Sequence, residues 1–158
     1  DELRECCCTA KEILHYQKKI SGPLLDRIDL QINVPRVEIK ELRSRNNELN
    51  IKEMAVVKKR ILKARKRQGE RFAGLKQRVL NNSEMSSRLC DRLIKLSLSA
   101  ESFIESVIDK SLVSARGYYR ILKVAQTIAD LDDSDSVNDN HLQEAFSYRT
   151  RDPSTLRL

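Results

Sequence analysis

The spacing of apolar residues predicts a mainly helical chain. Apolar residues recur every three or four positions over 10–20, over 52–68 and in four stretches after residue 84, which is the period of a helix with one buried face. Residues 28–34 differ, because apolar and polar residues alternate there as in a strand with one buried face. We therefore expect one helix and one strand followed by a helical bundle.

Local signals predict where these elements begin and end. Thr9 and Glu12 have the spacing of a capping box, so the first helix should run from about 10 to 20. Gly69 is suitably placed to end the helix over 52–68, and residues 70–82 hint at a further helical piece. Serine or asparagine precedes each of the last three helices, at Ser99, Ser114 and Asn138.

The predicted strand over 28–34 has no partner in this sequence. One strand cannot form a sheet, so its partners should lie outside the chain or in another copy of it. The chain also opens with Asp1 instead of Met and reaches a cysteine cluster within six residues. We therefore expect a fragment of a longer protein.

Length and composition exclude several classes of protein. The chain has 158 residues, no Trp and only 4% aromatic residues, so a strand-rich sandwich or barrel and a multidomain enzyme are both disfavoured. No apolar run approaches the roughly 18 residues that a membrane span needs, and no secretory signal is present. We expect a soluble, cytoplasmic protein that does not bind membranes.

Positive charge is concentrated in one segment. Residues 52–78 hold 11 Lys and Arg against two Glu, in a chain whose net charge is +7. Such a helix attracts polyanions by counterion release, which predicts DNA binding through Lys58, Lys59, Lys63, Lys66 and Arg67. Two other interpretations stay open: the charges could form a solvated face, or meet an acidic patch on a missing neighbour. Residues 132–136 are predicted to form an acidic loop before the last helix.

Familiar catalytic and nucleotide-binding motifs are absent from the sequence. There is no G-x-x-x-x-G-K-[ST], G-x-G-x-x-G or H-E-x-x-H, so the chain should not hold nucleotide by itself. His15 and His141 have no nucleophile or carboxylate pattern around them and are expected to be surface or core residues. Cys90 falls on an apolar helical face and is expected to be a small core residue.

Three strings carry a family resemblance. Residues 20–30 read I-S-G-P-L-L-D-R-I-D-L, residues 112–131 read L-V-S-A-R-G-Y-Y-R-I-L-K-V-A-Q-T-I-A-D-L, and residues 141–149 read H-L-Q-E-A-F-S-Y-R. They resemble the magnesium-chelatase-like AAA+ ATPases, nearest to the ComM/YifB branch. Gln126 departs from the pattern, which has Arg there. The resemblance runs from Cys6 to about Arg151 but corresponds only to the carboxy-terminal third of such a protein.

The resemblance implies a division of the chain. Residues 1–35 would end an AAA+ core, with the orphan strand at 28–34. Residues 36–82 would form a basic helical linker, 83–151 the helical lid domain and 152–158 a tail. The family's Walker A and Walker B loops, which bind ATP and Mg²⁺, would lie upstream, so the chain alone should bind no cofactor and have no ATPase activity.

The resemblance also assigns roles to two arginines. Arg27 matches the family's arginine finger, which neutralises charge on the γ-phosphate bound by a neighbouring subunit. Without the match, an ion pair of Arg27 with Asp26 or Asp29 would be the simpler interpretation. Arg116 matches the sensor 2 arginine near a helix start, where a nearby anion would compensate its charge.

Cys6 and Cys8 match the second half of a C-x-C pair pattern in the family. Four thiolates could bind zinc tetrahedrally, but only half of the set is present, so free thiols are the expected state here.

The implied function is ATP hydrolysis in a DNA-remodelling ring, of helicase or branch-migration type. The implied partners are the upstream AAA+ core, further copies in a homo-oligomeric ring, expected to be a hexamer, and DNA. Two alternatives remain: a stand-alone basic helical DNA-binding module, and a subunit of a magnesium-chelatase-type metal-insertion ATPase.

Overall fold

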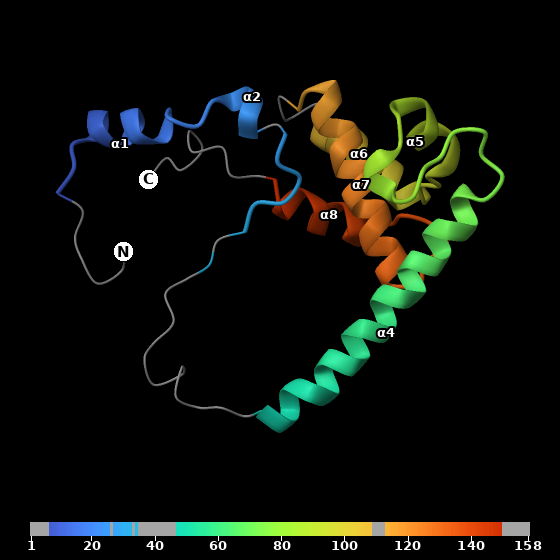
Figure 1. The fold of residues 1–158 in the computed structure, drawn as a ribbon. Coiled ribbons are helices and arrows are strands. Elements are labelled where there is room, and N and C mark those ends of the chain that lie inside the picture. The colour runs from blue at the N-terminus through green and yellow to red at the C-terminus, as the bar shows by residue number, and fades with distance from the viewer. Residues whose placement is uncertain (1–6, 26, 33, 35–46, 109–112, 150–158) are drawn as a thin grey trace.

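The computed structural model describes residues 7–25, 27–32, 34, 47–108 and 113–149 and is predominantly helical (Figure 1). The mainly α fold class predicted from the apolar spacing is confirmed. The elements are α1 (Ala10–Gln17), α2 (Gly22–Leu25), α4 (Asn47–Phe72), a 3₁₀ turn η1 (Asn82–Glu84), α5 (Ser87–Leu93), α6 (Leu98–Ile108), α7 (Ala115–Leu131) and α8 (Asp139–Ser147).

The main core lies where α8 packs against both α7 and α6 (Figure 1). Val137, in the connection from α7 to α8, is completely buried. Its N–H donates to the carbonyl of Lys95 (2.8 Å), and its carbonyl accepts from the N–H of Ser97 (2.9 Å). This bridge closes the bundle beside the start of α6. The main core takes most of its buried side chains from α7 and α8, namely Ile121, Leu122, Ala125, Ile128, Ala129, Leu142 and Ala145.

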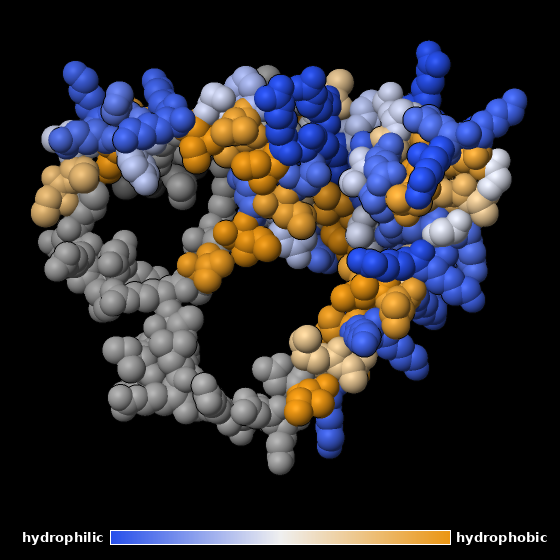
Figure 2. Space-filling view, in the orientation of Figure 1, coloured by the Kyte–Doolittle hydropathy of each residue, from blue (hydrophilic) through white to orange (hydrophobic). Residues whose placement is uncertain are grey.

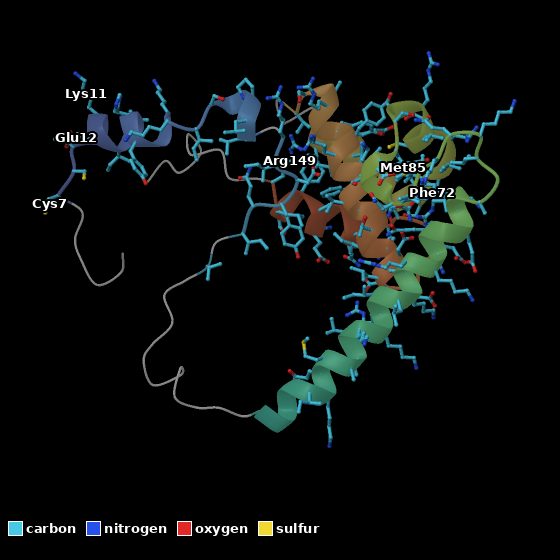
Figure 3. All side chains as sticks on the ribbon, viewed as in Figure 1. Cys7, Lys11, Glu12, Phe72, Met85 and Arg149 are labelled. Carbon is cyan, nitrogen blue, oxygen red and sulfur yellow. The ribbon has the colours of Figure 1, made fainter. Side chains whose placement is uncertain are left out.

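A smaller core joins the end of α4 to α5. Its buried members are Phe72, Val79, Met85 and Cys90, and Figure 3 shows Phe72 and Met85 close to each other in this region. Cys90 is therefore a core residue, as its apolar helical face predicts. Residues 73–81 form turns, bends and irregular chain, so the further helical piece predicted over 70–82 is wrong beyond the end of α4.

Several predicted helix starts are confirmed by their caps. Thr9 and Glu12 form the capping box of α1, Ser114 accepts from the N–H of Gly117 (3.1 Å), and Asn138 accepts from the N–H of His141 (3.0 Å). The start of α6 differs, since Ser97 and not Ser99 accepts from the first-turn N–H of Ala100 (3.2 Å).

The predicted end of the basic helix is wrong. α4 passes through Gly69 and ends at Phe72, because Phe72 is 7% exposed and belongs to the smaller core. Gly74 supplies the turn instead, with φ of +81°, a left-handed conformation that favours glycine.

The strand predicted over 28–34 is not formed. None of the described residues of that segment lies in a strand, and the N–H of Gln31 donates to the carbonyl of Tyr148 (2.8 Å), just beyond α8. The apolar side chains of the alternating pattern are exposed, from 40% for Ile28 to 79% for Val34. A strand needs a neighbouring strand to bond with its backbone, and the described residues contain none.

The first half of α4 extends beyond the body of the bundle (Figure 1). Its apolar stripe of Met54, Val57 and Ile61 is between 41% and 62% exposed. Figure 2 shows apolar and hydrophilic side chains alternating over this projecting helix. In the part of the chain that the structure describes, no helix is both long enough and apolar enough to pass through a bilayer.

Substitution of two glycines will test where α4 ends. A Cβ at Gly69 would meet nothing within 4 Å, so Gly69→Ala should raise the free energy of unfolding by about 0.5–1 kcal/mol through better helix propensity. Gly74→Ala should lower it by about 1 kcal/mol, because the left-handed conformation then carries a Cβ. Urea unfolding followed by circular dichroism measures both. A stability loss in Gly69→Ala would place the helix end at residue 69.

Candidate functional site

Arg116 lies in the first turn of α7, and its side chain is exposed. Ser114 caps this helix through its hydroxyl. The free N–H groups of a first turn favour anions, so an arginine there gains from an anion bound nearby. The position predicted for the sensor 2 arginine is therefore accessible to a ligand.

Arg120, one turn after Arg116, joins α7 to the segment that carries Arg27. Its Nη1 atom donates to the carbonyl of Arg27 (2.6 Å) and to the Oδ1 atom of Asp29 (2.5 Å). Arg27 itself is exposed. Asp29, weighed above as the ion-pair partner of Arg27, is thus bound by Arg120, while Asp26 lies outside the described residues. The backbone of Arg27 and the first turns of α7 are neighbours.

Arg149 adds a third guanidinium beside the start of α7. A Cβ built on Gly117 would lie 3.2 Å from its Nη2 atom and 3.0 Å from the Cγ1 atom of Val113. The absence of a side chain at the buried Gly117 therefore lets Arg149 approach the helix. Arg149 belongs to one of the family strings, but no local signal in the sequence links it to α7.

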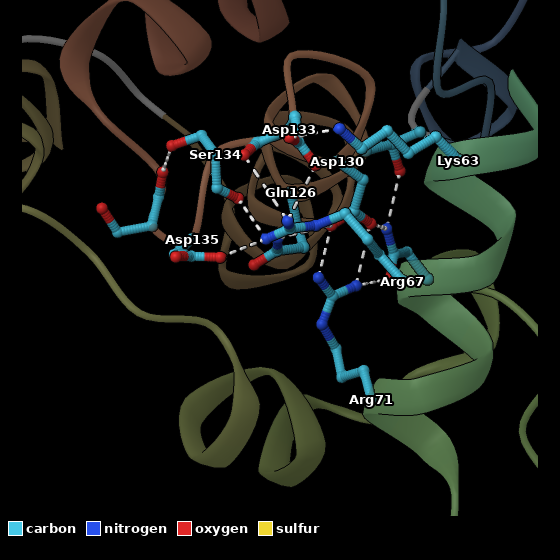
Figure 4. Close-up of polar contacts among 11 residues, drawn as sticks. Lys63, Arg67, Arg71, Gln126, Asp130, Asp133, Ser134 and Asp135 are labelled. Atoms are coloured by element: carbon cyan, nitrogen blue, oxygen red, sulfur yellow. Dashed lines mark hydrogen bonds and ion pairs between the residues drawn. The ribbon is translucent and has the colours of Figure 1, made fainter. Parts of the chain in front are cut away.

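The basic face of α4 meets the acidic loop after α7. Arg60 bonds to Asp132 (2.6 Å) and Lys63 to Asp133 (2.5 Å). Arg67 bonds to Asp133 (3.0 Å) and to Asp135 (2.6 Å), as Figure 4 shows. Part of the basic face therefore meets an acidic partner within this chain and not on a missing neighbour.

These ion pairs shift the pKa values of Asp133 and Arg67. The hydrogen bond from Lys63, followed by that from Arg67, lowers the pKa of Asp133 below its ordinary value. The hydrogen bond to Asp135, and then that to Asp133, raises the pKa of Arg67 in spite of its partial loss of hydration. Both shifts favour the charged forms.

Deeper in the same contact lies a fully buried carboxylate, Asp130. Arg71 donates to both of its oxygens, and Asn82 and Gln126 add hydrogen bonds of 2.8 and 3.2 Å (Figure 4). Asn82 also accepts from Arg71 (2.9 Å) and donates to Thr127 (3.1 Å). A buried charge is tolerated when it is paired and hydrogen-bonded in this way.

The predicted nucleic-acid residues divide into two groups. Lys63 and Arg67 bind the acidic loop, whereas Lys58, Lys59 and Lys66 are exposed, with Lys66 3.8 Å from Glu70 on its own helix. The side of α4 that faces the acidic residues could have been found from the sequence. Its members recur at helical intervals, at Arg60, Lys63, Arg67 and Arg71.

The cysteines and histidines form no metal site within the described residues. In that part of the chain, no group of three or more His, Cys, Asp or Glu could hold a metal ion. Cys8 is exposed and Cys6 lies outside the described residues. Burial raises the pKa of the Cys90 thiol, which keeps it protonated. His141 is buried and its Nδ1 atom accepts from the N–H of Asn138 (3.2 Å), so it is a core residue that completes a helix cap.

A comparison with family models matches residues 52–149 to "Magnesium chelatase, subunit ChlI C-terminal". The chain belongs to the magnesium-chelatase family. A second model, "Magnesium chelatase, subunit ChlI", matches residues 1–42. The family resemblance of the three strings is thereby confirmed.

Curated relatives indicate the branch. The chain is 35% identical over 151 residues to the YifB protein of Escherichia coli, covering 96% of this chain and 28% of that protein. It is 37% identical over 139 residues to the competence protein ComM of Haemophilus influenzae, covering 88% of this chain and 26% of that protein. The chain matches the ComM/YifB type and spans about a quarter of the length of these relatives.

Removing the partner of the buried carboxylate will test the network around it. Arg71→Met keeps most of the side-chain length but leaves Asp130 with only the more distant cation of Arg67 (3.9 Å), which should lower the free energy of unfolding by about 3 kcal/mol. Arg65→Met is the matched control, because Arg65 is an exposed residue of the same helix, and its stability should be unchanged. Urea unfolding of both variants gives the difference. Equal stabilities would mean that the pair does not hold α4 to α7.

Proposed function

We propose that this chain forms the carboxy-terminal part of a ComM/YifB-type ATPase that remodels DNA in the cytoplasm. Arg27 would act as the arginine finger and Arg116 as sensor 2 in a homo-oligomeric ring, proposed to be a hexamer. The observation that supports this most is the bond of Arg120 to the backbone of Arg27, because it holds the two proposed arginines beside one end of α7.

Arg27 and Arg116 are suited to bind a phosphate group. Arg27 and Arg116 are both exposed, and their planar, permanently charged groups fit phosphate oxygens. The chain has no phosphate-binding loop of its own, so ATP and Mg²⁺ would be held by other parts of the ring. ATP supplies the bond that is hydrolysed, and Arg27 would neutralise the charge that develops on its γ-phosphate.

The basic outer face of α4 supports DNA as the substrate. Lys52, Lys59 and Lys66 are exposed and recur at seven-residue intervals, which places them on one stripe of the helix. The name of the Haemophilus relative, a competence protein, also supports DNA. The alternative of a metal-insertion ATPase rests on the family description alone.

The role of Arg27 can be tested in a chimera that carries this chain in place of the matching region of Escherichia coli YifB. Arg27→Ala should leave ATP binding nearly unchanged and lower kcat about a thousandfold or more, as expected for an arginine finger. Arg88→Ala, at an exposed arginine of α5, is the control and should hydrolyse ATP like the unsubstituted chimera. Normal turnover in Arg27→Ala would remove Arg27 from the reaction.

DNA binding can be tested on the 158-residue chain itself. Replacing Lys52, Lys59 and Lys66 by Gln should weaken binding to a duplex and reduce the slope of log K against log salt by about 2.7, if each Lys contacts one phosphate. The control replaces Lys11, Lys18 and Lys19 by Gln, an equal charge change at exposed positions on and just after α1. Fluorescence anisotropy over a salt series measures both. An equal loss in the two triple variants would indicate attraction by net charge only.

A further inference from the structure

Seven of the nine basic residues of α4 form one continuous arc around the helix, while Lys58 and Arg65 lie on its other side. At 3.6 residues per turn, the exposed Lys52, Lys59 and Lys66 lie on one side of an arc of about 140°, and Arg60, Arg67 and Arg71 lie on the other. Lys63 lies between the two groups. The acidic loop covers one side of this arc and leaves the other side open.

The covered side is held by two kinds of contact. Arg71 is anchored on the fully buried Asp130. The outer pairs are more open to solvent: the side chains of Arg60 and Asp132 are 55% and 46% exposed, and those of Lys63 and Asp133 are 58% and 45% exposed. Arg67 is intermediate, because its side chain is 23% exposed and also donates to the carbonyl of Ser134 (2.8 Å), whereas its partner Asp135 is 95% exposed. Exposed ion pairs contribute little stability and are screened by salt. A competing polyanion can therefore replace the outer carboxylates without breaking the buried anchor.

The loop presents its carboxylates on a fixed backbone. The N–H of Ser134 donates to the carbonyl of Ala129 (2.8 Å), and the N–H of Asp133 donates to that of Asp130 (3.3 Å). These are the two bonds of a Schellman cap at the end of α7. Asp133 occupies its left-handed position, with φ of 59°, where glycine would be less strained. The strained position thus carries a carboxylate that bonds to Lys63 and Arg67.

We propose that the acidic loop is a built-in competitor of nucleic acid for the basic arc of α4. A DNA backbone first engages the open lysines, then takes Lys63, Arg60 and Arg67 from Asp132, Asp133 and Asp135. The loop therefore weakens DNA binding in the resting chain. This inference rests on the proposed DNA binding of α4 and adds the device that limits it.

The test replaces Asp132, Asp133 and Asp135 by Asn in the 158-residue chain. Asn tolerates the left-handed conformation at 133, and Asp130 keeps its partners, so circular dichroism should show an unchanged fold. Anisotropy with a duplex of about 30 base pairs should show affinity raised by about tenfold or more, and a steeper salt dependence, because freed cations reach phosphates. Asp135→Asn alone leaves the cap intact and should give a smaller rise.

The matched control changes the same amount of charge elsewhere, by Asp91→Asn, Glu101→Gln and Glu105→Gln on α5 and α6. Equal gains in the loop and control variants would overturn the proposal, since net charge alone would then explain them. An unchanged affinity in the loop variant, with binding still lost in the Lys52, Lys59 and Lys66 variant, would overturn the loop's role but keep DNA binding. Failure of all variants and of the original chain to bind DNA would overturn both.

Discussion

One buried carboxylate constrains how this fold is assembled. Asp130 is fully removed from solvent, and a lone charge there would cost more than a small domain can supply. Its partners come from three elements: Arg71 from α4, Asn82 from η1 and Gln126 from α7. Burial of this residue therefore depends on the end of α4 and the turn at 82–84 as well as on α7.

The outer contacts of α4 depend on that anchor. Once Arg71 is fixed, the helical repeat brings Arg67, Lys63 and Arg60 in turn along the acidic loop. At the other end of α7, Arg120 fastens the segment of Arg27. A single helix thus connects the surface proposed to sense nucleotide with the surface proposed to meet DNA.

The features of the fold that could be predicted from the sequence are those set by interactions between residues close together in the chain. The capping residues Thr9, Ser114 and Asn138 act within a single turn, and the helices that they start were predicted from their spacing. The strand predicted over 28–34 is not formed, because a strand needs a neighbouring strand and the described residues contain none. The helix end predicted at Gly69 was wrong for a related reason, because burial of Phe72 in the smaller core extends α4 to residue 72.

The candidate site was predictable only in part. The family strings pointed to Arg27 and Arg116, but nothing local shows that Arg120 joins them, since it bonds a residue 93 positions away. The basic run and the acidic loop were both visible in the sequence, yet their pairing spans about 70 residues. A charge pattern reports which residues are available and not which of them face each other.

The projecting half of α4 has a mechanical consequence. From Arg60, the outermost residue held by the acidic loop, to the start of the helix at Asn47 the helix extends about 20 Å, at 1.5 Å per residue. A tilt of about 10° of the bundle then displaces the far tip by about 3 Å on this length. A rotation of the bundle by this amount would move the tip of α4 by about the length of a hydrogen bond.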